Sequence, residues 1–296
     1  MIGFEPLGHH SITYMARIFS VLILFASLSA TAERVRFPSS ADRDEGLAGE
    51  LLLEALKRGG KYTPTFPYEH LGSTPLSAIL NGMDTNEVDL FMAVTSKEYE
   101  KEYLPVYIPL FRGLMGMRIC IVRGDNTAIF KGVNSLSDLK EFSAGQGKLW
   151  ADTDILEAND LTVVKELKYP NLFRMLEADR FDYFPRALHE PWSEIAQVPD
   201  LNLTVESSIM LSYKAPFYVF VHKSNSVLAD HLTEQLELMV RDGTFLEMFY
   251  RDKKVSSALE QARVEDRIVI DLKNPFLTPG TQIDRPELWY SPKEER

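Results

Sequence analysis

The 296-residue sequence predicts an α/β protein of two lobes, the second inserted into the first, with a ligand cleft between them. Three observations support this prediction. The length suits two compact units of roughly 100–200 residues each. Short β-like runs alternate with helical patterns in two successive series, as in sheets covered by helices. Two apolar segments, residues 116–122 and 217–221, are placed to cross between the lobes and leave a cleft there.

The composition is that of an ordinary globular protein and excludes several classes of function. Hydrophobic residues make up 45% and charged residues 25% of the chain, which is enough to form sizeable cores. The net charge of -11 repels phosphate backbones, so we expect no nucleic-acid partner. The single cysteine, Cys120, excludes an intrachain disulfide, and its apolar neighbours predict a buried, inert thiol.

An apolar stretch near the N-terminus has the pattern of a secretory signal. Residues 18–28 (IFSVLILFASL) follow a basic residue and precede Ala30-Thr31-Ala32, whose small residues suit signal peptidase. The stretch is too short to span a bilayer comfortably, which disfavours an uncleaved anchor. We therefore expect residues 1–32 to be a signal peptide and the mature protein to be periplasmic. Met15 is an alternative start, which would leave residues 1–14 untranslated.

The first α/β series follows this signal. The pattern predicts, in order, a strand at 35–37, a helix at 46–58, a strand at 62–68, a helix at 73–83 and a buried strand at 88–94. Leucines at helical spacing define the first helix, which Gly59-Gly60 ends, and Pro75 suits the first turn of the second helix. This order implies a sheet with substantial parallel character.

The second series begins after the strand at 116–122. Ser135 and Asp138 have capping-box spacing at the start of its first helix. The pattern predicts helices at 135–142, 153–159, 170–178 and 187–196, and strands at 143–150, 162–164, 181–184 and 201–205. After the strand at 217–221 come helices at 228–241 and 245–249 and a strand at 267–272. We expect residues 33–122 and 218–296 to form the first lobe and residues 123–217 the inserted second lobe.

Several blocks of the sequence resemble the periplasmic solute-binding proteins of the amino-acid and polar-solute type. The blocks are GLAGELLLEALKRGG (46–60), LSAILNGMDTNEVDLFMAVTSKEYEKEYLPVYIPL (76–110), NSLSDLKEFSAGQGKLWADTDIL (134–156), LFRMLEADRFDYFPRALHE (172–190) and DHLTEQLELMVRDGTFLEMF (230–249). The resemblance implies the type 2 periplasmic-binding fold. It also implies capture of a small solute for a membrane ABC transporter. The alternative is a periplasmic sensing module that acts through a membrane signalling partner, and in either case we expect a monomer without a cofactor.

The resemblance also places the binding residues, and two of the family's charged groups are absent. The arginine that grips a ligand carboxylate shortly after the cleft threonine, here Thr95, is replaced by Glu98 or Tyr99. Neither can supply the bidentate fork of a guanidinium. The aspartate expected in the second lobe after Asp182 is replaced by Arg186. This pattern argues against a free α-amino acid, so we expect another small polar or anionic solute.

Five further residues are candidates for ligand contact, each with a structural alternative. Trp150 lies at a strand-to-helix turn, where it could stack on a ligand or pack internally, and Asp152 and Thr153 could present the helix N-terminus or only cap it. Arg118 begins a crossing strand and would contact the ligand or be paired. Arg43 follows the first strand and could reach the cleft.

Arg186 follows the strand expected at 181–184, so it should lie near a strand end that opens toward the cleft. Its guanidinium would meet a negative ligand group or pair with a protein carboxylate, for which Asp152 is the candidate.

The sequence contains no signature of an enzyme or of a metal site. It lacks a G-x-S-x-G elbow and an H-E-x-x-H pair, and the histidines that follow the signal are scattered. The segment Gly145-Gln146-Gly147-Lys148 lacks the further residues of a phosphate loop. We therefore expect a binding protein without catalytic residues.

The signal assignment makes a prediction about processing. The exported protein should begin at Glu33, because Ala30 and Ala32 satisfy the small-residue requirement of the peptidase. N-terminal sequencing of periplasmic material tests this, and an intact residue 1 or residue 15 would contradict it.

Overall fold

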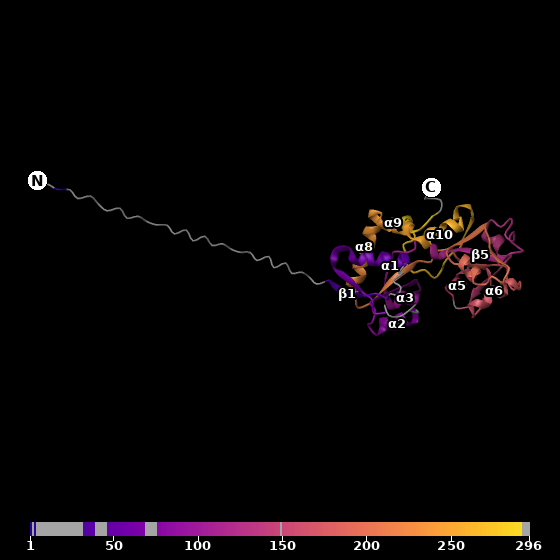
Figure 1. Cartoon of the computed structure of the whole chain (residues 1–296), viewed down its shortest axis with the longest axis horizontal. Coiled ribbons are helices and arrows are strands. Elements are labelled where there is room, and N and C mark those ends of the chain that lie inside the picture. Colours follow the sequence, from indigo (N-terminus) through magenta and orange to yellow (C-terminus); the bar gives the residue numbers. More distant parts are fainter. Residues whose placement is uncertain (2, 4–31, 39–45, 69–75, 149, 292–296) are drawn as a thin grey trace. The chain divides into compact units, whose positions relative to one another are not determined.

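The computed structural model describes residues 1, 3, 32–38, 46–68, 76–148 and 150–291 (Figure 1). The chain divides into residues 1–31 and residues 32–296, and the fold described below is that of the second part. The expected signal segment 18–28 and the candidate Arg43 lie outside the described residues. Within the described ranges, no helix is both long and apolar enough to cross a membrane.

Among the described residues, the first lobe is built on five strands. They are β1 (Glu33–Arg36), β2 (Tyr62–Thr65), β3 (Leu90–Val94), β4 (Tyr103–Val106) and β11 (Phe217–His222). β1 and β2 are parallel, and β11 lies antiparallel between β3 and β4. The backbone amide of Asp89, next to β3, donates to the carbonyl of Arg36 at 3.0 Å and so brings β1 and β3 together.

Helices cover these strands, as the apolar periodicity predicts. They are α1 (Gly46–Lys57), α2 (Leu76–Asp84), α3 (Lys97–Glu102), α8 (Ser226–Asp242), α9 (Thr244–Arg251) and α10 (Lys253–Ala262), and Figure 1 shows α1, α2, α3 and α8 grouped together, apart from α5 and α6 of the second lobe. The leucines of α1 that repeat at helical spacing, such as Leu51 and Leu52, are fully buried and share a core with Leu232 and Leu236 of α8. Tertiary packing of this apolar face stabilises α1.

The second lobe contains the remaining strands and the shorter helices. Its strands are β5 (Met117–Arg123), β6 (Ser143–Gly147), β7 (Thr162–Glu166), β8 (Phe184–Ala187), β9 (Leu203–Val205), β10 (Ile209–Ser212) and β12 (Ile268–Asp271). Its helices are α4 (Leu136–Leu139), α5 (Ala151–Glu157), α6 (Tyr169–Glu177) and α7 (Pro191–Ala196). β5 pairs antiparallel with β8, β9 and β10, β10 pairs parallel with β12, and β6 pairs parallel with β7.

The strand pairing corrects the expected crossings and lobe boundaries. The segment expected to cross at 116–122 is β5, which lies inside the second sheet, and the segment expected to cross at 217–221 is β11, which lies inside the first. Residues 107–116 and 213–216, which precede these two strands, make the crossings there, and residues 263–267 cross once more before β12. β12 also joins the second sheet, although residues 218–296 were all assigned to the first lobe. Apolar periodicity locates a buried strand but does not reveal which sheet it enters.

The two crossings meet at Gly116. The amide of Tyr213 donates to the carbonyl of Gly116 at 3.0 Å, and a Cβ placed on Gly116 would lie 1.8 Å from the carbonyl oxygen of Tyr213. Only glycine therefore allows the backbones to approach so closely. Cys120 lies a few residues further along β5, is fully buried as predicted, and burial raises the pKa of its thiol well above the usual value.

The close approach at Gly116 makes a prediction about stability. Gly116→Ala should lower the free energy of unfolding by about 1–3 kcal/mol, because a backbone atom must move to admit the methyl group. Gly124→Ala is the matched control, since its Cβ would meet only the side chain of the exposed Asn202. Urea unfolding followed by circular dichroism measures both, and equal losses would contradict the constraint.

Candidate ligand-binding site

A cavity of about 440 Å³ lies between the loop after β3 and the turn that begins α5. Of the predicted contact residues, Thr95, Arg118, Trp150 and Asp152 line this cavity, whereas Thr153 and Arg186 do not. The other lining residues are Val94, Ser96, Lys97, Glu98, Ala151, Asp154, Ile155, Ala215, Pro216, Asn274, Phe276 and Leu277. The cavity therefore joins the two predicted binding loops, a crossing segment and part of the C-terminal chain.

Thr95 is held in the loop by hydrogen bonds to protein groups. Its amide donates to the carbonyl of Pro216 at 2.9 Å, and its hydroxyl donates to Glu100 Oε1 at 2.5 Å. The other oxygen of Glu100 accepts from Tyr107 at 2.7 Å and from Thr278 at 2.5 Å. Burial and the Glu100 carboxylate raise the pKa of Tyr107 to about 12. Sequence analysis missed Glu100, because nothing distinguishes it from the other charged residues of α3.

Arg118 is buried at the floor of the cavity and is paired within the protein. Its guanidinium lies 2.6 Å from Asp152 Oδ1 and 3.6 Å from Glu190 Oε2, and its Nε donates to the hydroxyl of Tyr213 at 2.9 Å. That hydroxyl in turn donates to Asp152. Burial lowers the pKa of Arg118, but the nearby Asp152, Tyr213 and Glu190 outweigh it and the pKa is raised. Arg118 is therefore protonated, and the neighbouring carboxylates of the protein neutralise its charge.

Arg186 makes the ion pair that was one of its two expected roles, but with different partners. Its Nε and Nη2 donate to Glu194 at 2.6–3.0 Å, and Nη2 lies 3.0 Å from Glu190 Oε1. Asp152, the expected partner, is paired with Arg118 instead. The predicted strand at 181–184 is β8 at Phe184–Ala187, so Arg186 lies inside a buried strand and not at its end.

Aromatic rings enclose the buried guanidinium of Arg186. Its central carbon lies 4.9 Å from the ring centroid of Trp150, 5.0 Å from that of Phe184 and 5.5 Å from that of Tyr169. Tyr169 also donates to Glu194 at 2.7 Å. Trp150 stacks on Phe184 at 14° and 6.2 Å between centroids, while another part of the ring lines the cavity. Trp150 thus packs internally and forms a cavity wall at the same time.

The expected capping roles of Asp152 and Thr153 are wrong. The residue at the N-cap of α5 is Trp150, which makes no side-chain capping hydrogen bond. The hydroxyl of Thr153 is buried and donates to the carbonyl of Gly147 at 2.7 Å, which fixes the turn. Thr153 therefore supports the site from behind and does not face the cavity.

The two arginines belong to one network that carries more negative than positive charge. Glu190 contacts both guanidiniums, while Asp152 pairs with Arg118 and Glu194 with Arg186. Three carboxylates thus face two guanidiniums in a region where an unpaired charge would be costly. The network has no surplus positive charge to offer an anionic ligand. The sequence signal for this network is the pair of acidic residues, Glu190 and Glu194, four and eight positions after Arg186.

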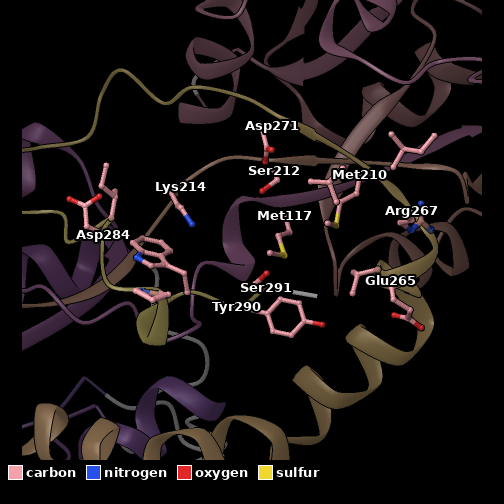
Figure 2. Close-up of a pocket in the computed structure, with 16 residues that line it drawn as sticks. Met117, Met210, Ser212, Lys214, Glu265, Arg267, Asp271, Asp284, Tyr290 and Ser291 are labelled. Carbon is pink, nitrogen blue, oxygen red and sulfur yellow. The ribbon is translucent and has the colours of Figure 1, made fainter. Parts of the chain in front are cut away.

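A second cavity, of about 650 Å³, lies outside this site (Figure 2). Figure 2 shows Met117, Met210 and Ser212 together, with Asp284 on one side and Glu265 and Arg267 on the other.

The positive charges of this second cavity already have protein partners. Arg267 donates to the carbonyls of Ala262, Glu206 and Ile209 at 2.6–2.9 Å. Lys214 lies 4.4 Å from the ring centroid of Trp289. This cavity is the weaker ligand candidate, because it contains none of the predicted binding loops. Among the described residues, no group of three or more His, Cys, Asp or Glu is arranged to hold a metal ion.

Comparison with known proteins shows the fold. No protein-family model and no curated protein matches the chain. Among solved structures, the "probable amino-acid ABC transporter extracellular-binding protein ytmK" from Bacillus subtilis is 17% identical and has a TM-score of 0.52, over 76% of this chain and 99% of that chain. An ancestral arginine-binding protein bound to arginine is also 17% identical, with a TM-score of 0.48 over 75% and 99% of the two chains. The likeness to the Bacillus subtilis protein confirms the type 2 periplasmic-binding fold.

The buried pair of Arg186 and Glu194 makes a prediction about stability. Glu194→Gln should lower the free energy of unfolding by about 3–5 kcal/mol, because it leaves a buried guanidinium short of a carboxylate. The control is Asp200→Asn, whose pair with Arg174 at 3.8 Å has both side chains mostly exposed and should contribute less than about 1 kcal/mol. Chemical denaturation measures both variants, and similar losses would show that the buried pair is unimportant.

Proposed function

We propose that the protein is a periplasmic solute-binding protein that captures a small polar solute carrying a cationic group. The observation that carries this proposal is the charge of the cavity between the two binding loops. Asp152 and Arg118 pair with each other on its lining, which leaves the carboxylates of Glu98 and Asp154 beside one cation, Lys97. An anion would have to compete with Asp152 and Glu190 for Arg118, whereas a cation gains new partners.

The position of Glu98 supports the same sign of charge. Glu98 and Tyr99 are the two residues that could replace the arginine with which the resembled family grips a ligand carboxylate, and of these two Glu98 lines the cavity. A carboxylate there favours an amine or guanidinium over an acid. The anionic solutes considered from the sequence are therefore disfavoured, while the expectation of a polar solute stands.

We further propose delivery of this solute to a membrane ABC transporter. The fold is shared with a Bacillus subtilis protein described as an ABC transporter extracellular-binding protein, and the cavity lies between the lobes, where such a fold closes on a solute. Deleting the gene should abolish uptake of the bound solute. A loss of a transcriptional or signalling response with uptake intact would favour the sensing alternative.

The sign of the ligand charge is tested by calorimetric titration of the purified protein. Putrescine, which carries no carboxylate, should bind most tightly, L-arginine more weakly and L-glutamine more weakly still, and succinate should not bind. Glu98→Gln should weaken binding of the cationic probe by about ten- to hundredfold, the range for a hydrogen bond to a charged group.

The control is Glu102→Gln. Glu102 lies in α3, the helix that also contains Glu98, but it is exposed and does not line the cavity. Its affinity should match that of the wild type. Preferential binding of succinate, or no binding of either cationic probe, would contradict the proposed function.

A further inference from the structure

The chain continues beyond the last block of the family resemblance, and its final segment joins the two lobes again. After α10 it crosses over residues 263–267, adds β12 to the second sheet and then returns toward the first lobe. We name residues 273–290 the C-terminal strap. At its start, Asn159 is buried and holds Lys273 from both sides: its Nδ2 donates to the carbonyl at 2.7 Å, and its Oδ1 accepts from the amide at 2.9 Å.

The far end of the strap is held by the first lobe. Thr278 donates to Glu100 at 2.5 Å, and Arg285 forms a bidentate pair with Glu237 of α8 at 2.5 and 2.9 Å. Gly280 packs so closely on Tyr107 that a Cβ would lie 2.1 Å from the ring. Fixed contacts at both ends therefore determine the path of the few residues between them.

Those intermediate residues form one side of the ligand cavity. Asn274 donates to the carbonyl of Lys214 in the crossing segment at 2.8 Å, and its Oδ1 accepts from the amide of Phe276 at 3.0 Å. The backbone of Phe276 is thereby fixed, while the residue remains 42% exposed and lines the cavity together with Leu277. An exposed phenyl ring gains free energy when an apolar part of a ligand covers it.

We propose that the C-terminal strap is a third wall of the ligand site and that Phe276 is a specificity-determining residue in it. This inference rests on the proposed function. The phenyl ring packs against the aliphatic chain of the solute, while the carboxylates of the same cavity bind its cationic group. The ring thus selects solutes that carry enough apolar surface beside the charge.

The experiment titrates the purified protein and its variants with putrescine and L-arginine. Phe276→Ala should weaken the tighter of the two interactions by about tenfold or more, as expected for loss of an apolar contact of this size. Ile283→Ala is the matched control, because Ile283 is 52% exposed on the same strap but lines the other cavity. It should bind like the wild type.

Melting temperatures separate binding from folding. Both positions are solvent-facing, so both variants should melt close to the wild type, and a large drop for Phe276→Ala alone would overturn the inference by showing a structural role. If the wild type binds a cationic probe and Phe276→Ala binds it with the same affinity, the inference about Phe276 is overturned and the proposed function remains intact. If the wild type binds neither probe, the proposed function and the inference fail together.

Discussion

The arrangement of the second lobe depends on the cost of burying two guanidiniums side by side. Arg118 of β5 and Arg186 of β8 lie on paired strands, and both guanidiniums contact Glu190. Neither can lose its proton at physiological pH, so each needs carboxylates within reach. This requirement brings Asp152 of α5 and Glu190 and Glu194 at the start of α7 toward the same point. The turns that form the cavity are positioned by these contacts.

The same constraint sets the chemistry that the cavity can offer. An arginine that pairs with two carboxylates and donates to a tyrosine hydroxyl is neutralised within the protein, and it presents little positive potential to a ligand. The carboxylates that remain on the lining, such as Glu98 and Asp154, then dominate. The arginines in the sequence alone predict an anionic ligand, whereas their pairing in the structure favours a cationic one. The aromatic rings around Arg186 add cation–π contacts, which further stabilise its charge within the protein.

Local patterns predicted much of the fold, because several helices carry clear apolar periodicity. The limits of α1 and the Ser135–Asp138 capping box agree with the sequence analysis. β8 was misplaced by three residues, since the apolar run Phe181–Phe184 ends where the strand begins and Pro185 disguises its continuation. That shift moved Arg186 from an expected loop into a buried strand. The partners of each charge depend on strand pairing, which periodicity does not contain.

The C-terminal strap was also beyond reach of the sequence, since a proline-rich segment has no period to interpret. The strap connects the lobes by a path of its own, in addition to the crossings at residues 107–116, 213–216 and 263–267. The largest apolar core already continues from the first lobe onto Met117, Ile119 and Met210 of the second. A hinge motion that parts the lobes would have to separate this core or release the strap from Asn159 or Glu100.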